Sequence, residues 1–381
     1  MEREIVVVGA GPSGSATAIA LKQAGHDVLL IDRQEFPRDK ACGDGIPAGA
    51  IEILFSLGME EKIRGADFYP VYRLLLSSPR GYVLEADLKK GKTGADSCVV
   101  PRTEFDALIQ QHAVEAGVEF CKARAKEPII EDGRVTGVRV RQNGSDQEIR
   151  SKVVVGADGV TSVIARALSP DTHEDKHRAV ALRTYISDIE ELPHEVEFYL
   201  YQGILPGYAW IFPLGEGRAN LGLGMRLDKF RDANESLEQM VEVFLDIPDV
   251  NKRIKHGGKL NNTAVWQLNF GSKPIQRAYD GALLVGDAAG LINPLTGGGI
   301  HNGLQSALQA ANVIHDALVK DDTSLTQLQV YDHRIEESMK KSMRKSYLIQ
   351  RSLLYFPSWV DILIRWGGSN SDLAKTFIDK L

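Results

Sequence analysis

The chain has 381 residues, 43% of them hydrophobic and 25% charged, a composition typical of a globular protein larger than one ordinary domain. Its formal net charge of −6 leaves no basic surplus for phosphates, so a nucleic-acid partner is not expected. We expect a cytoplasmic protein without a leader peptide or membrane span, because the chain begins directly in a predicted strand, has three cysteines without a C-x-x-C pair, and lacks a run of about 18 apolar residues.

The first predicted unit is a strand, a glycine turn, a helix and a second strand. Residues 5–8 are apolar and β-branched, residues 15–24 favour a helix, and residues 27–31 favour a strand. The turn has three glycines at the G-x-G-x-x-G spacing: Gly9, Gly11 and Gly14. Asp32 ends the second strand, where such units present an acid to ribose hydroxyls. The whole pattern predicts dinucleotide binding, with the pyrophosphate at the helix N-terminus.

A loop dense in glycine and charge follows at 34–45, before a predicted helix at 47–57. Cys42 lies in this loop, and the neighbouring Lys40 would favour its thiolate near a reacting centre. The alternative is a small thiol chosen for its size. Both interpretations stay open at this point.

Residues 72–78 and 82–88 predict a hairpin, and a short strand at 98–101 leads into a helix at 104–116 capped by Thr103. Arg102 would lie where this strand meets the helix. From there an arginine reaches a cofactor phosphate or ring edge, unless it is an ordinary surface residue.

A β-meander is predicted from 118 to 155. Its last strand runs into a second glycine and acid turn, Gly156-Ala-Asp-Gly159. Asp158 is therefore a second candidate ligand contact, with a plain Asp-Gly turn as the alternative.

Residues 178–270 predict an antiparallel sheet with alternating apolar positions, interrupted by a helix at 237–245. Many of its apolar residues are aromatic: Tyr199, Tyr201, Tyr208, Trp210, Phe212 and Trp266. They line an apolar pocket or form the core of the sheet itself.

The glycine and acid pattern then returns a third time. A strand at 282–285 ends in Gly286 and Asp287, and a glycine loop enters a predicted helix at 300–319. Unpaired N–H groups at such a helix start suit an anion or an electron-rich carbonyl. His301 is a candidate acid there, although such a histidine more often only packs.

The last segment combines a basic stretch at 339–345 with an aromatic, apolar stretch at 347–359. This composition favours contact with anionic lipid, or equally a helix that closes the core.

Three glycine and acid turns at these positions resemble the FAD-dependent oxidoreductases of the aromatic-hydroxylase superfamily. Within it, Lys40-Ala-Cys-Gly-Asp-Gly45 and Tyr208-Ala-Trp-Ile-Phe-Pro213 are similar to motifs of the geranylgeranyl reductase family. The resemblance implies an α/β fold: a Rossmann-type, glutathione-reductase-like FAD-binding domain, an antiparallel-sheet substrate domain and a C-terminal helical segment. We expect the FAD domain at 1–70, 97–177 and 272–338, the substrate domain at 71–96 and 178–271, and the helical region at 339–381.

The resemblance also implies site residues. The expected FAD contacts are Gly9, Gly11, Pro12, Ser13, Gly14, Asp32, Arg33, Cys42, Gly43, Arg102, Asp158, Gly286, Asp287, Pro294, Gly297, Gly298, Gly299 and Ile300. The expected substrate contacts are Cys42, Tyr208, Trp210, Phe212, Gly222 and Gly224, with Cys42 also the expected catalytic residue. No metal ligand set is expected.

The implied reaction is hydride transfer from reduced FAD to carbon–carbon double bonds of an isoprenoid chain on a lipid or pigment. The alternative is an FAD-dependent monooxygenase or halogenase acting on an aromatic or apolar small molecule. Because the chain has no second nucleotide fingerprint, the external electron donor stays open between NADPH and reduced ferredoxin. The sequence also leaves the oligomeric state open.

Overall fold

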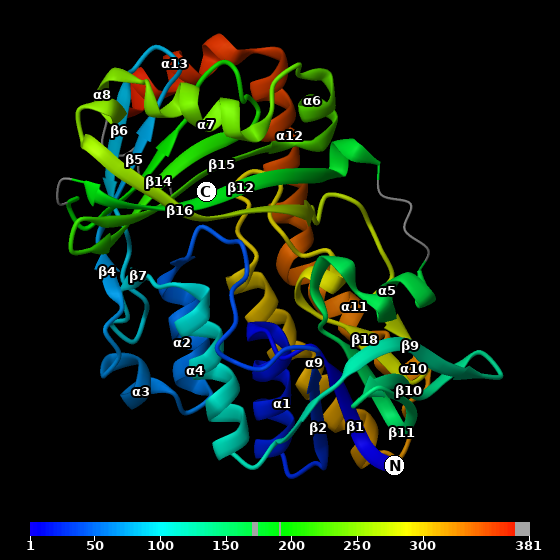
Figure 1. The fold of residues 1–381 in the computed structure, drawn as a ribbon. Helices are drawn as coiled ribbons and strands as arrows, with labels where there is room; N and C mark the ends of the chain where they lie inside the picture. The colour runs from blue at the N-terminus through cyan, green and yellow to red at the C-terminus, as the bar shows by residue number, and fades with distance from the viewer. Residues whose placement is uncertain (170–173, 190–191, 370–381) are drawn as a thin grey trace.

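The computed structural model describes residues 1–169, 174–189 and 192–369. A mixed sheet whose central strands run parallel forms the lower half of the molecule in Figure 1. Its strands, in spatial order, are β17 (Ala278–Tyr279), β18 (Ala282–Leu284), β11 (Ser145–Gly156), β1 (Glu2–Val8), β2 (Val28–Asp32) and β8 (Glu119–Lys122). The buried parts of β1, β2 and β18 are continuous apolar runs, at residues 5–8, 28–31 and 282–284, as is typical of parallel strands inside a protein.

Helices pack on one face of this sheet. The central one is α1 (Pro12–Gln23), which contacts α4 (Arg102–Glu115) and α9 (Ile300–Val319). Pro12 occupies the first turn of α1, where the missing N–H has no partner to lose. The neighbouring α2 (Ala48–Ser56) also packs on α9, and α3 (Glu60–Arg64) follows it. The apolar core of this unit lies between these helices and the sheet.

A β-ribbon is attached to the parallel sheet through β11. It contains β9 (Arg124–Glu131) and β10 (Arg134–Gln142), which pair antiparallel with each other, and β10 pairs with β11. The predicted meander is therefore correct for its last three strands only. Its first strand, β8, pairs parallel with β2 and belongs to the central sheet. The short α5 (Val163–Leu168) follows β11.

The second large sheet lies across the upper half in Figure 1. Its spatial order is β16 (Ile254–Asn269), β12 (Arg178–Ile189), β15 (Arg218–Arg226), β14 (Tyr208–Gly215), β13 (Glu195–Tyr199), β5 (Arg73–Ser77) and β6 (Val83–Asp87). The predicted hairpin thus joins the edge of this sheet, and the sheet is antiparallel except where β5 pairs parallel with β13. One face is covered by α7 (Leu237–Leu245), near α6 (Leu227–Asp232) and α8 (Pro248–Asn251).

A small three-stranded sheet connects the two halves: β3 (Gly45–Ile46), β7 (Ser97–Val99) and β4 (Tyr69–Val71). The chain then ends in α10 (Leu325–Leu328), α11 (Val330–Ile335), a π-helical turn at Glu336–Lys340, α12 (Lys341–Tyr355) and α13 (Pro357–Ser369). The end of the expected helical region, from 370 onward, lies outside the described residues. None of the helices within the described ranges is long and apolar enough to cross a membrane.

The predicted cap of α4 is wrong. The helix begins at Arg102 with Pro101 as the N-cap residue, and no side chain caps it. Because Thr103 already lies inside the helix, its side chain is not in the position that receives the free N–H groups.

Candidate active site

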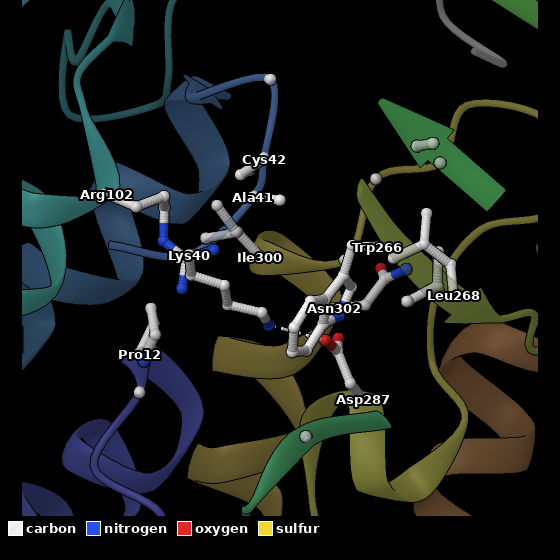
Figure 2. Close-up of a pocket in the computed structure, with 18 of the residues that line it drawn as sticks. Pro12, Lys40, Ala41, Cys42, Arg102, Trp266, Leu268, Asp287, Ile300 and Asn302 are labelled. Carbon is white, nitrogen blue, oxygen red and sulfur yellow. Dashed lines mark hydrogen bonds and ion pairs between the residues drawn. The ribbon is translucent and has the colours of Figure 1, made fainter. Parts of the chain in front are cut away.

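A cavity of about 1190 Å³ lies between the nucleotide-type turns and the second sheet. Sites for small molecules and cofactors are usually about 300–1,000 Å³, so this one has room for more than one ligand. Figure 2 shows side chains from both halves of the molecule converging on it, including Pro12 and Asp287 beside the parallel sheet and Trp266 from β16 of the second sheet.

The first glycine turn leaves one side of the backbone open to this cavity. A Cβ atom on Gly11 would meet only the end of the Arg38 side chain, at 3.4 Å. By contrast, a Cβ on Gly14 would lie 1.8 Å from the carbonyl oxygen of Gly9, and Gly9 itself has φ +103°. Gly9 and Gly14 therefore shape and pack the turn, whereas Gly11 gives a ligand close access to the backbone.

Asp32, the acid at the end of β2, is held by backbone N–H groups of the first turn and of the loop that follows β2. The backbone N–H of Ala10 donates to Asp32 Oδ2 at 2.8 Å, and that of Gln34 donates to Oδ1 at 2.9 Å. The carboxylate lines the cavity with lone pairs remaining on both oxygens.

In the second acid turn, the carboxylate binds to residues that follow it directly in the chain. Asp158 accepts hydrogen bonds from the Ser162 hydroxyl and, at 2.7 Å, from the backbone N–H of Val163 at the start of α5. Its carboxylate thus stabilises this helix start, and Asp158 also borders the cavity.

The third turn has an ion pair at its centre. Lys40 Nζ lies 2.9 Å from Asp287 Oδ2, and Figure 2 shows the lysine reaching across the cavity to this carboxylate. Burial alone would raise the pKa of Asp287, but Lys40 and Arg102 outweigh it and hold the pKa below its ordinary value. Asp287 is therefore ionised. Gly286, behind it, packs against Ser13, whose Oγ would be 2.5 Å from a Cβ there.

The loop that carries Cys42 is held by polar contacts from both halves of the molecule. Arg38 pairs with Asp106 of α4 at 2.8 Å, and Asp39 receives two hydrogen bonds from Arg183 of β12, at 2.8 and 2.7 Å. The carbonyl of Cys42 accepts from Asn220 Nδ2 of β15 at 2.8 Å. Such a loop holds its side chains in fixed positions.

The cation beside Cys42 is Arg102 and not the predicted Lys40, whose ammonium pairs with Asp287. Arg102 is buried, 3% exposed, and donates to both oxygens of Asp106 at 2.6 and 2.7 Å. Burial would lower the pKa of Arg102, but Asp106 and the nearby Cys42 raise it. Arg102 is therefore a buried cation bordering the cavity rather than a surface residue.

The aromatic side chains of β14 form a single wall. Tyr208, Trp210 and Phe212 alternate along the strand, line the cavity and contact one another through their rings. Tyr199 and Tyr201 lie on the opposite face of the sheet, where both rings pack on Phe244 of α7. The aromatic residues of the sheet thus divide between pocket and core, which the sequence pattern left open.

The two glycines of β15 have different places. Gly224 lines the cavity. A Cβ on Gly222 would lie 2.4 Å from the indole of Trp210, so this glycine provides space for the ring to lie on the sheet. The indole Nε1–H donates to Asn220 Oδ1 at 2.8 Å.

His301 packs in the first turn of α9. Its ring lies against Gly49, where a Cβ would come within 2.9 Å of it. Burial lowers the pKa of His301, so the ring is neutral near pH 7 and unsuited to donate a proton as an imidazolium. This favours packing over the role of an acid.

Most of the expected contacts border the cavity: Gly9, Gly11, Pro12, Ser13, Asp32, Arg33, Cys42, Gly43, Arg102, Asp158, Asp287, Pro294, Gly297, Gly298, Gly299, Ile300, Tyr208, Trp210, Phe212 and Gly224. Gly14, Gly286 and Gly222 lie behind it as packing positions. In the part of the chain that the structure describes, no cluster of three His, Cys, Asp or Glu side chains is arranged to hold a metal ion.

Three residues that the sequence patterns did not indicate fix the Cys42 loop from the second sheet: Arg183, Tyr185 and Asn220. A signal was present, because Arg183 directly follows the apolar run 179–182 and Asn220 lies between Ala219 and Leu221. Buried polar residues of this kind need partners, but their partners lie about 140 to 180 positions away along the chain.

The cavity fits a dinucleotide carrying a polar ring. Gly11 leaves room for a pyrophosphate at the start of α1, and α9 presents an uncapped N-terminus on the far side. Trp266 Nε1 is buried beside the cavity with no acceptor in the part of the chain that the structure describes. A bound ligand with carbonyl or ring-nitrogen acceptors would satisfy such a donor.

Comparisons with known proteins agree with this geometry. Residues 2–346 match the family model described as FAD binding domain. The chain is 34% identical over 366 residues to digeranylgeranylglycerophospholipid reductase 2 of Methanopyrus kandleri, covering 93% of this chain and 87% of that relative.

Solved structures share the fold. A geranylgeranyl bacteriochlorophyll reductase-like protein from Thermoplasma acidophilum aligns over 100% of this chain and 99% of its own, with a TM-score of 0.84 and 24% identity. The flavin-dependent brominase Bmp2 aligns over 100% of this chain and 93% of its own, with a TM-score of 0.81 and 21% identity.

Proposed function

The chain belongs to the geranylgeranyl reductase family of FAD-dependent oxidoreductases, and on this premise we propose that it reduces carbon–carbon double bonds in the isoprenoid chains of a membrane lipid. The observation that carries the proposal is the wall formed by Tyr208, Trp210 and Phe212, which borders the same cavity as the three nucleotide-type turns. The wall suits a long hydrocarbon, whose burial contributes about 0.8 kcal/mol per CH₂. The cavity thus has a polar side for FAD and an apolar side for the chain.

The residues of this chain bind and orient the reactants. When bound, reduced FAD supplies a hydride to one carbon of the double bond. We assign the pyrophosphate to the open side of Gly11 and the start of α1, and ribose hydroxyls to Asp32. The ionised Asp287 is suited to accept hydrogen bonds from ribitol hydroxyls.

The loop with Cys42 lies between these two regions. It is fixed by Arg183 and Asn220 of the substrate-side sheet, so its position depends on both halves of the molecule. Cys42 contributes a thiol to the boundary between the cofactor side and the aromatic wall. We propose that it positions the alkene.

The monooxygenase or halogenase alternative has weaker support. The brominase resembles this chain at 21% identity, which establishes a common fold only. The relative at 34% identity is a reductase by name and covers nearly the whole chain. We therefore assign the chain to the reductases.

The test of the proposed function is anaerobic. Chemically reduced holoenzyme mixed with a geranylgeranylated glycerophospholipid in detergent should regain the absorbance of oxidised flavin in proportion to the double bonds reduced. A fully saturated lipid is the matched control and should leave the flavin reduced. Reoxidation by both lipids, or by neither, would contradict the proposal.

We further propose that the C-terminal helices rest on a lipid surface. Their outer faces expose large apolar side chains: Leu348, Tyr355, Phe356, Trp359 and Ile362, each more than half exposed. Their inner faces contribute Leu353, Val360 and Ile364 to the apolar cluster that also contains Trp210 and Phe212, and α13 lies against β6. The exposed basic residues Arg344 and Lys345 lie on α12, which also carries Leu348 and Tyr355, and they match an anionic membrane. A lipid leaving the bilayer there would be next to the wall.

This contact predicts membrane partition. The double variant Phe356→Ser/Trp359→Ser should bind vesicles of anionic phosphatidylglycerol at least about tenfold more weakly, because burying one such side chain contributes about 1.5–3 kcal/mol. Val319→Ser changes an exposed residue on α9 and should bind like the wild type. Cosedimentation measures both. If the wild-type protein does not bind these vesicles at low salt, or if the double variant binds them equally well, the C-terminal helices do not rest on a lipid surface.

A further inference from the structure

Asp44 stands out among the carboxylates of the cavity because it is fully buried and only half satisfied. It is 0% exposed, and its Oδ2 accepts hydrogen bonds from the Tyr185 hydroxyl and from Asn220 Nδ2, both at 2.7 Å. Its Oδ1 is buried without a hydrogen-bond partner among residues 1–169, 174–189 and 192–369, although Asp44 borders the cavity. An unpaired buried carboxylate oxygen is costly when ionised, and protonation of that oxygen removes most of the cost.

The nearest cations do not hold Asp44 in its ionised form. Arg102 donates to both oxygens of Asp106, and Arg183 donates to both oxygens of Asp39. The charge of each arginine is thus largely balanced by another carboxylate. The other groups facing Asp44 are the Tyr185 hydroxyl, the Asn220 amide and the thiol of Cys42, which accepts the Asp44 N–H at 3.4 Å.

Burial therefore dominates and raises the pKa of Asp44 to about 6, against the hydrogen bonds from Tyr185 and Asn220 and the charges of Arg102 and Arg183. Asp287, in the same cavity, has its pKa lowered because Lys40 pairs with it. Two carboxylates whose environments move their pKa values apart are typical of a site that keeps one as an acid and one as an anion.

Asp44 is connected both to the loop that carries Cys42 and to the aromatic wall. It lies two residues after Cys42 in this loop, and Asn220 connects it to Trp210, because Asn220 donates to Asp44 and accepts from the Trp210 indole. Asp158 is half-buried, and desolvation raises its pKa too, but both of its oxygens accept hydrogen bonds at the start of α5. Among the described carboxylates that border the cavity, Asp44 has a buried oxygen with no partner.

We propose that Asp44 is the internal acid of the site, and that its unpaired Oδ1 carries the proton which the alkene takes up at one carbon while the other carbon receives the hydride. The inference rests on the proposed function. The π bond breaks, two C–H bonds form, the reduced cofactor gives up two electrons with its hydride, and Asp44 becomes a carboxylate that regains a proton from solvent before the next turnover. Cys42 then positions the alkene and need not donate the proton.

The test is the pH dependence of a single reductive turnover, followed anaerobically by flavin absorbance with geranylgeranylated glycerophospholipid in detergent. Wild-type reoxidation should slow as the pH rises through about 6, because the protonated fraction of Asp44 falls. Asp44→Asn should retain FAD, slow this step by at least about 100-fold, and lose the pH dependence. Tyr185→Phe removes a hydrogen bond that lowers the pKa of Asp44, so its pH midpoint should move upward.

An infrared difference spectrum of the holoenzyme across pH 6 provides a measurement without substrate. The band of a protonated carboxylic acid should appear in wild-type protein and lose intensity in Asp44→Asn. One set of outcomes would reject only the role of Asp44. If the wild-type enzyme reduces the lipid and Asp44→Asn either keeps the wild-type rate or is slow with the wild-type pH midpoint, Asp44 is not the acid. The proposed reductase function would be unaffected by that result. If the infrared band depends on Asp44 but no prenyl lipid reoxidises the flavin of the wild-type enzyme, the proposed function is wrong. Asp44 would then still be a protonated carboxylic acid in the site.

Discussion

Replacing Gly11 with valine should abolish FAD binding and leave the fold intact. A Cβ at this position meets only the flexible end of Arg38, and the backbone of Gly11 has φ −67° and ψ 179°, an extended conformation that valine adopts readily. The branched side chain would instead fill the space through which a pyrophosphate approaches the start of α1. The purified variant should be colourless, with a far-UV circular dichroism spectrum like that of the wild-type apoprotein.

Gly14→Val is the informative comparison for this variant. Its Cβ would overlap the carbonyl oxygen of Gly9, at 1.8 Å, so the loss of FAD there should come with a loss of stability. Thermal denaturation of the two apoproteins separates these causes. A yellow Gly11→Val protein with one FAD per chain would show that the first turn does not hold the pyrophosphate.

Trp210→Ala should weaken the binding of long isoprenoid chains far more than that of short ones. Trp210 is the middle residue of the wall and is 6% exposed, so its truncation opens a space beside the chain. A chain that contacts the whole ring loses the burial of about three CH₂ groups at about 0.8 kcal/mol each, which corresponds to roughly 50-fold in affinity. The measurement is the dissociation constant of the wild type and the variant for two analogues of one lipid, one with a geranylgeranyl chain and one with a single isoprene unit. The ratio of the two affinity losses gives the dependence on chain length.

Two further variants separate the wall from the sheet. Trp210→Phe keeps an aromatic ring but loses the hydrogen bond to Asn220, so it should keep most of the preference for long chains. Tyr201→Ala removes a ring from the opposite face, where it packs on Phe244, and should leave the ratio unchanged. Equal losses for long and short chains in Trp210→Ala would mean that this residue supports the fold and does not line the chain.

Local patterns in the sequence predicted the elements that build the site, because glycine turns and strand alternation are local signals. The three turns at Gly11, Asp158 and Asp287 lie around one cavity, as the order of strand, turn and helix indicated. The period of two in β14 likewise predicted that Tyr208, Trp210 and Phe212 share a face.

Pairings between distant residues could not be predicted from the same signals. The loop with Cys42 is fixed by Arg183 and Asn220, more than a hundred positions away, and Lys40 pairs with Asp287 although Cys42 is its neighbour in sequence. Likewise, alternation predicts two faces of a strand without saying which is covered by a helix, so the packing of Tyr199 on α7 was not foreseen. Such contacts depend on tertiary structure, which overrides local preference.

The central claim is that this chain adds hydrogen across isoprenoid double bonds, and the mass of the product tests it most directly. Chemically reduced holoenzyme incubated with a geranylgeranylated glycerophospholipid under strict exclusion of oxygen should yield lipid that is heavier by two hydrogens for each double bond reduced, and should form it equally well whether or not halide is present. Lipid that is unchanged without oxygen, but carries an oxygen or halogen atom once oxygen is admitted, would contradict the account and identify a monooxygenase or halogenase.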